Sequence, residues 1–175
     1  MEYGELLTRW TVRLALVAYV LFLAHGLCRG RLDRAARAAW TIGCVAMLIH
    51  VACAFHFVHQ WSHAEAYQIT ARRTAEVIGW SFGGGVYLNH LFLLVWTADV
   101  LWWWTRPAEY LARPHWIGIC MQSFCVVMAV SGAIVFEPGP TRPVGVVVCV
   151  FLTVLAWRAL KRSRRLVVAG SGAHG

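Results

Sequence analysis

Five long apolar blocks, separated by short polar segments, dominate the pattern of this chain. Each block has about the number of residues that a helix needs to cross the hydrocarbon core of a membrane, roughly 17 to 25. Because lipid offers the backbone no hydrogen-bond partners, every peptide group in such a block must be paired within a helix. We therefore predict an all-α polytopic membrane helix bundle, in which residues 1–168 form a single integral membrane domain. The five predicted transmembrane helices cover about residues 10–28, 38–59, 83–104, 115–136 and 143–159.

The longest polar segment between the blocks predicts a short amphipathic helix on the outer membrane surface, over residues 63–78. Ser62 and Glu65 form the S-x-x-E pattern of a capping box. Gly79 is typical of a helix end. The glycines Gly83–Gly85 that follow indicate a flexible or closely packed start to the next helix. Apolar residues recur at helical spacing along the predicted surface helix: Tyr67, Ala71, Ala75 and Ile78.

Composition supports a membrane protein and argues against a soluble domain. Of the 175 residues, 59% are hydrophobic and only 14% are charged, and the mean hydropathy is +0.59. Soluble domains carry about a quarter charged residues. A cleavable signal peptide is the alternative for the first block, but no small-x-small cleavage site follows it. The glycine-rich tail, residues 169–175, is low in complexity and is predicted to be disordered.

The basic residues predict how the chain is oriented. With the amino terminus outside, eleven of the sixteen lysines and arginines fall on the cytoplasmic side, which satisfies the positive-inside rule. We therefore expect an external amino terminus and a cytoplasmic carboxyl terminus, in a bacterial inner membrane. The basic run at residues 161–165 then serves as an orientation signal, so no nucleic-acid partner is expected. The expected partners are the lipid bilayer and other membrane subunits.

Histidines concentrate near the outer end of the second block and predict a metal site. His56, His59 and His63 fall within about 60° of one another if the helix is continuous. His90 lies at a similar depth in the third block, which runs antiparallel to the second. Imidazole is the commonest ligand for zinc, copper and iron. The predicted metal site therefore joins His56, His59 and His90, with His63 or Glu65 as a further ligand.

A haem b site is the second version of this hypothesis. One histidine from each of two facing helices would ligate the iron, either His50 or His56 on one side and His90 on the other. The chain lacks the CxxCH motif of covalent haem and the repeated HxxHH boxes of membrane di-iron enzymes. In the alternative without a cofactor, the histidines are solvated at the membrane edge or paired with neighbouring polar side chains, and they could also titrate near neutral pH.

Asp99 is the acidic residue deepest within a predicted span, and an ionisable group in such a place is a functional hypothesis by default. Two roles are open for it. It could act as a proton relay, or it could pair with Arg106, seven residues later, whose long side chain can reach back into the membrane.

These patterns favour a small membrane protein that binds a metal ion or haem through histidines near its outer face, as a redox or electron-transfer subunit of a larger complex. A non-catalytic accessory subunit, whose histidines only form a polar rim, is the alternative from a different class. A small transporter or proton channel would require Asp99 and His50 to face a shared cavity. No motif in the chain assigns a substrate or an enzymatic reaction.

Overall fold

The computed structural model describes residues 2–132 and 141–171, and within these ranges the chain is helical and forms no strand. The helices are α1 (Glu2–Arg29), α2 (Arg34–Cys53), the π-helical turn η1 (Ala54–Val58), α3 (His63–Ile78), α4 (Gly85–Thr105), α5 (Pro107–Ala112), α6 (His115–Val130) and α7 (Thr141–Ser171). The predicted all-α class is therefore confirmed.

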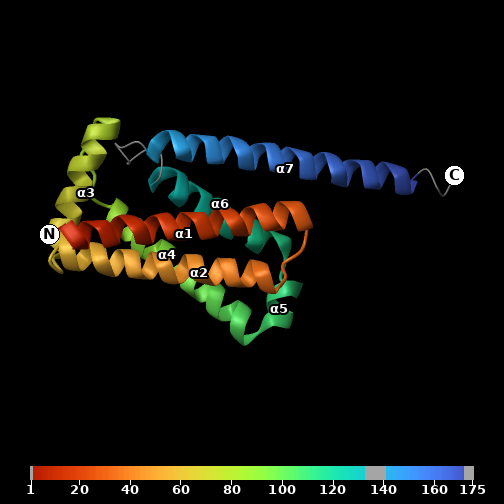
Figure 1. Ribbon diagram of the computed structural model, residues 1–175, viewed down its shortest axis with the longest axis horizontal. Coiled ribbons are helices and arrows are strands. Elements are labelled where there is room, and N and C mark those ends of the chain that lie inside the picture. Colours follow the sequence, from red (N-terminus) through yellow and green to blue (C-terminus); the bar gives the residue numbers. More distant parts are fainter. Residues whose placement is uncertain (1, 133–140, 172–175) are drawn as a thin grey trace.

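Helices α1, α2, α4 and α6 form a bundle, with contacts of α1 with α2, α2 with α4, and α4 with α6 (Figure 1). Helix α3 lies across one end of this bundle and α5 lies at the other end. Helix α7 runs beside α1 and projects past the bundle (Figure 1). We call the end with η1, α3 and the start of α4 the histidine end. The opposite end, with the α1–α2 connection and α5, is the arginine end.

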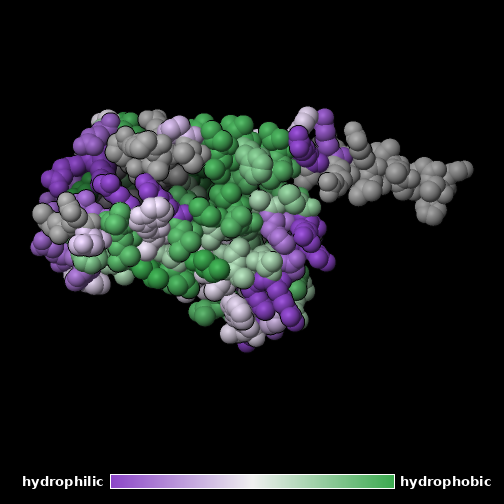
Figure 2. Space-filling model, viewed as in Figure 1, coloured by the Kyte–Doolittle hydropathy of each residue, from purple (hydrophilic) through white to green (hydrophobic). Residues whose placement is uncertain are grey.

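Three helical segments are long and apolar enough to cross a membrane: Tyr3–Arg29, Arg34–Val58 and Gly85–Thr105. The described parts of the fourth and fifth predicted spans form shorter apolar helices, His115–Val130 and Gly145–Arg158. Residues 133–136 of the fourth predicted span lie outside the described residues. Hydrophilic residues gather at both ends of the bundle and hydrophobic ones form a band between them (Figure 2). The chain is thus a helical membrane protein.

Aromatic side chains from α1, α2 and α4 fill the bundle core. The Trp40 ring lies 4.8 Å from that of Trp96 and 4.6 Å from that of Phe22, measured between centroids. Gly43 makes room for this packing, since a Cβ atom there would lie 2.9 Å from the Trp96 ring. Close approach of helices at small residues is a common way to pack membrane helices. The core therefore lies between α1, α2 and α4, and Tyr110 of α5 and Met121 and Cys125 of α6 also belong to it.

The predicted surface helix has the bounds expected for it. The Ser62 hydroxyl accepts a hydrogen bond from the Glu65 backbone N–H at 3.2 Å, and Gly79 ends the helix with a φ of 76°. Ala66 and Thr74 are the buried residues of α3, and Tyr67 on the predicted apolar face is exposed. Because the apolar face of a surface helix would contact lipid rather than protein, this face stays a prediction. The expected close packing at the glycines is found at Gly83, where a Cβ atom would lie 2.5 Å from the Tyr67 carbonyl oxygen.

The first three residues of the carboxyl-terminal tail, 169–171, were predicted to be disordered but are helical. Helix α7 continues to Ser171, three residues into the segment predicted to be disordered. Helix propagation adds one hydrogen bond for each further residue, so a long helix readily extends past an apolar stretch. Residues 172–175 lie outside the described residues.

Candidate functional site

The helix that carries His56 does not continue to His63, so the predicted shared helical face is wrong. The His59 N–H bonds to the Ala54 carbonyl at 3.0 Å, a π-helical spacing that changes the register of the side chains. Gln60 and Trp61 then adopt left-handed backbone, with φ of 47° and 60°. Such conformations cost non-glycine residues roughly 1–2 kcal/mol each and cluster at functional sites. The helix therefore ends at His59, and His63 belongs to α3.

A different group of histidines forms around the buried ring of Phe55. Measured between centroids, this ring lies 5.1 Å from His63, 5.6 Å from His90 and 5.4 Å from His59. The rings of His63 and His90 lie 5.5 Å from each other. The tertiary fold thus pairs His63 with His90.

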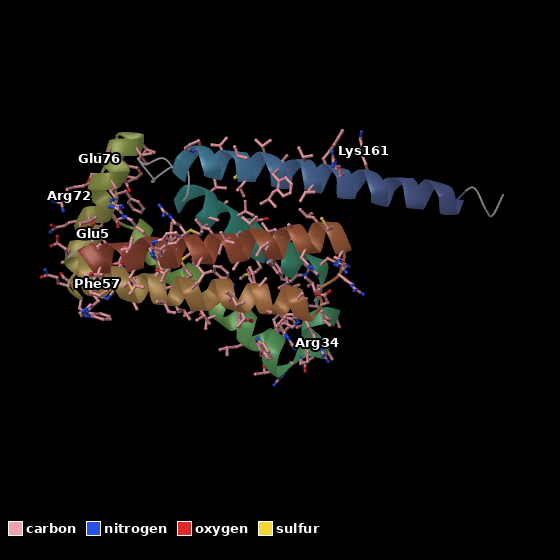
Figure 3. All side chains as sticks on the ribbon, viewed as in Figure 1. Glu5, Arg34, Phe57, Arg72, Glu76 and Lys161 are labelled. Carbon is pink, nitrogen blue, oxygen red and sulfur yellow. The ribbon has the colours of Figure 1, made fainter. Side chains whose placement is uncertain are left out.

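His56 stands apart from this group on the exposed side of η1. The Trp61 indole N–H donates to its Nδ1 at 3.2 Å, so this nitrogen acts as an acceptor and its lone pair is already used. Phe57, the neighbouring residue, lies on the outside of the histidine end (Figure 3). The sequence pattern predicts His56 at the centre of the site, but the π-helical turn directs it elsewhere.

Local hydrogen bonding fixes the tautomer of His90. Its Nδ1 lies 2.6 Å from the carbonyl oxygen of Val86, one turn earlier in α4. A carbonyl oxygen only accepts, so Nδ1 must carry the proton and Nε2 must hold the free lone pair. This is the arrangement that backbone carbonyls impose on metal-ligating histidines, where it orients the ring and raises its basicity.

His59 is a partly buried member of the group. Burial lowers the pKa of its imidazole, the cation of Arg73 lowers it further, and the carboxylate of Glu65 opposes them. Its Nδ1 is buried without a hydrogen-bond partner. Glu65 itself is exposed on the first turn of α3.

The predicted set of three or four metal ligands is not assembled. Across residues 2–132 and 141–171, no three side chains of His, Cys, Asp or Glu lie in positions to hold one metal ion. His50 contacts α1 instead, where its Nδ1 lies 2.9 Å from the Thr8 carbonyl oxygen and donates to it. What the fold provides at the histidine end is a pair of imidazoles, with a third beside it.

Asp99 lies at the arginine end and is held by three donors. Its carboxylate accepts from the Trp40 indole N–H at 2.9 Å, the Tyr110 hydroxyl at 2.8 Å and Arg113 Nη1 at 2.6 Å. Asp99 and Arg113 are only 7% and 9% exposed. The guanidinium also sits 3.8 Å from the centroid of the Tyr110 ring. A carboxylate with this many fixed partners, one of them a cation, is suited to hold helices together rather than to pass protons.

The partner predicted for Asp99 was wrong. Arg106 lies on the surface, where it pairs with Glu109 at 3.4 Å, and Arg113 takes its place. Helix α5 turns the chain back toward α4, so a residue 14 positions from Asp99 reaches it. The same turn buries Tyr110, and burial together with the nearby Asp99 carboxylate raises the pKa of its phenol. Sequence reasoning missed Trp40, Tyr110 and Arg113, whose only signal was their position at a predicted membrane boundary.

Asp99 bonds to Trp40 of α2 and Tyr110 of α5, whereas His50 donates to the Thr8 carbonyl of α1. The transporter or proton channel stays a prediction. No protein family, no curated protein and no solved structure matches this chain. The two polar groups just described are therefore the basis for a proposed function.

Proposed function

We propose that this membrane protein binds one transition-metal ion at its histidine end, through His63 and His90. It would do so as a subunit of a larger membrane complex. Copper or iron would give the site a role in electron transfer, whereas zinc has no redox chemistry and could not.

The separation of the two rings is the observation that carries this proposal. Two imidazoles that bind one ion at about 2 Å in tetrahedral geometry hold their ring centroids roughly 5 Å apart. The centroids of His63 and His90 lie 5.5 Å apart, which is close to this separation. The hydrogen bond from His90 Nδ1 to the Val86 carbonyl leaves Nε2 of that ring as the ligand atom.

The surroundings favour an open site. His63 and Glu65 are exposed, so water or a side chain of a partner subunit can complete the coordination sphere. His59 adds an imidazole beside the pair, at 5.4 Å from the Phe55 ring that both ligands touch. An ion bound by two protein ligands keeps open positions, as catalytic and transfer sites do and closed structural sites do not.

The same geometry argues against haem b at this pair. A haem plane would have to pass between His63 and His90, and Phe55 contacts both rings, at 5.1 and 5.6 Å. A single ion needs no such space. We therefore propose a single transition-metal ion, rather than haem b, as the cofactor.

We also propose five membrane crossings, with the amino terminus outside and the carboxyl terminus in the cytoplasm of a bacterium. Apolar helices at His115–Val130 and Gly145–Arg158 support two crossings beyond the three long ones. The arginines of the α1–α2 connection, at the arginine end, support a cytoplasmic position for that end. The metal site would then face the outside.

Metal analysis of the purified protein tests the function. The protein, in mild detergent, would be titrated with Co²⁺, Cu²⁺ and Zn²⁺, and bound metal counted after gel filtration. We expect one ion per chain, with the absorption of histidine-bound Co²⁺. His63→Ala and His90→Ala should each lose it. His56→Ala should retain it, although His56 was central to the site expected from sequence, and so should His115→Ala at the opposite end.

Two results would reject the metal proposal: no stoichiometric ion in the wild-type protein, or an ion that persists in the His63→Ala/His90→Ala double variant. If the protein remains folded and binds no ion, a non-catalytic accessory subunit becomes the better interpretation.

A further inference from the structure

A groove between α1 and α2 at the arginine end lies outside both polar groups described above. Its volume is about 430 Å³, and it is open along one side. The residues that line it come from the last two turns of α1 and the first two of α2: Leu21, Ala24, His25, Cys28, Arg29, Ala35 and Ala39.

The groove is apolar along its length and basic at its mouth. Leu21, Ala24 and Ala39 offer hydrocarbon, and the small alanines leave the space between the two helices unfilled. Arg29 lies at the last turn of α1, at the end of the apolar stretch. A site with this polarity suits a molecule that is apolar at one end and anionic at the other.

The acidic residue near the mouth is already neutralised. The Asp33 carboxylate caps α2 by accepting from the Ala35 and Ala36 N–H groups, at 3.1 Å each. It also lies 2.9 Å from His25 Nε2 and 3.6 Å from Arg31 Nε. In the part of the chain that the structure describes, no acidic side chain pairs with Arg29, which therefore remains available to an anion.

Residues 29–37 contain four arginines and one aspartate, a formal charge of +3. Arg34 lies at this end of the bundle, beside the start of α2 (Figure 3). Clusters of arginine at the end of a membrane helix attract anionic lipid, by about 1 kcal/mol for each charge near the surface. Arg29 is the last residue of α1 and Arg34 is the first residue of α2. Arginines at the ends of apolar membrane helices lie at the level of the lipid headgroups.

We infer that this groove binds one anionic phospholipid. Arg29 contacts the phosphate, and one acyl chain lies along Leu21, Ala24 and Ala39. The lipid holds α1 against α2 at the connection between them. This inference does not depend on the metal site, which lies at the other end of the bundle.

The test compares lipids on the delipidated full-length protein in detergent. Thermal unfolding would be followed after addition of phosphatidylglycerol, of phosphatidylcholine or of inorganic phosphate. We expect phosphatidylglycerol to raise the Tm by several degrees and the other two to leave it nearly unchanged. Native mass spectrometry should show one retained phosphatidylglycerol per chain.

Two variants locate the lipid. Arg29→Gln removes the anchoring cation, and Ala35→Phe fills the groove from an exposed position of α2. Each should reduce the phosphatidylglycerol shift to less than half of its wild-type size. Arg9→Gln is the matched control, because it removes one surface arginine of α1 far from the groove and should leave the shift unchanged.

An equal shift with phosphatidylcholine or inorganic phosphate would overturn the inference, since either charge or hydrocarbon alone would then explain it. An unchanged lipid shift in both groove variants would also overturn it. If Arg29→Gln does not fold, Ala35→Phe and the lipid comparison on wild-type protein still decide the question.

Discussion

Replacing Arg113 by methionine would leave the Asp99 carboxylate buried without its cation. The two side chains are 9% and 7% exposed, and the Arg113 Nη1 to Asp99 Oδ1 distance is 2.6 Å. Replacing Asp99 by asparagine would produce the converse defect, a buried guanidinium without a counter-charge. The double variant would contain neither charge.

The expected size of the effect separates an ion pair from ordinary polar contacts. Removing one partner of a buried pair costs about 3–5 kcal/mol, because the remaining charge stays desolvated. Neutral hydrogen bonds between membrane helices contribute only about 0.6 kcal/mol on average. We therefore expect each single variant to lose at least about 3 kcal/mol of unfolding free energy. The double variant should lose less unfolding free energy than the sum of the two single losses, by about 1–3 kcal/mol.

Unfolding in mixed micelles, followed by tryptophan fluorescence, measures these values. Trp40 reports on the site directly, since its indole N–H bonds to Asp99 and its ring packs on Trp96. Arg106→Met serves as control, because its exposed pair with Glu109 should contribute less than about 1 kcal/mol. Two results would show that no buried ion pair joins α4 to the segment after α5. One is a loss of unfolding free energy below about 1 kcal/mol in both single variants. The other is a double variant whose loss equals the sum of the two single losses.

Three further predictions concern packing, capping and pH. Gly43→Ala should destabilise the bundle by about 1–3 kcal/mol, because the new Cβ atom would lie 2.9 Å from the buried Trp96 ring. Gly26→Ala is the control and should not destabilise it, because no atom lies within 4 Å of the Cβ position there. Equal thermal stability of the two variants would contradict this prediction. Ser62→Ala should lower the free energy of unfolding by about 1 kcal/mol and speed amide hydrogen exchange at the start of α3. Ser62→Asp should keep the wild-type stability and exchange rate, because aspartate also caps a helix. Unchanged exchange in the alanine variant would count against the cap. His59 has a lowered pKa in the folded protein, so the unfolded chain takes up a proton first as the pH falls below about 6.5, and stability should decrease there. His59→Gln should flatten this part of the curve of Tm against pH, and an unchanged slope would show that another group causes it.

Helix boundaries near polar signals were predictable, and the contacts made by individual side chains were not. Residues 63–78 form α3 as expected, because the Ser62 cap and the Gly79 end are local backbone effects. Which side chains of the same helix are buried within the fold was not predicted: Ala66 and Thr74 are the buried ones. Which face packs depends on neighbours that lie far away in sequence.

At the candidate site, too, the position of the residues was predictable and their contacts were not. The sequence located the histidines at one end of the bundle, but a single π-helical turn moved His56 out of the group and left His63 to pair with His90. Such a turn is rare and inserts one residue into a helical turn, so a prediction that assumes a regular α-helix assigns the residues after it to the wrong face.

The amino-acid pattern alone is enough to predict a helical membrane protein, because apolar length and the need to pair every backbone group in lipid leave few alternatives. The same pattern predicts which ends are polar and where the surface helix begins. The folded chain was needed to show that Asp99 meets Arg113 rather than Arg106, and that His63 meets His90. These pairings depend on how α5 and η1 redirect the chain, and at Asp99 burial then requires that the carboxylate be satisfied by the partners within reach.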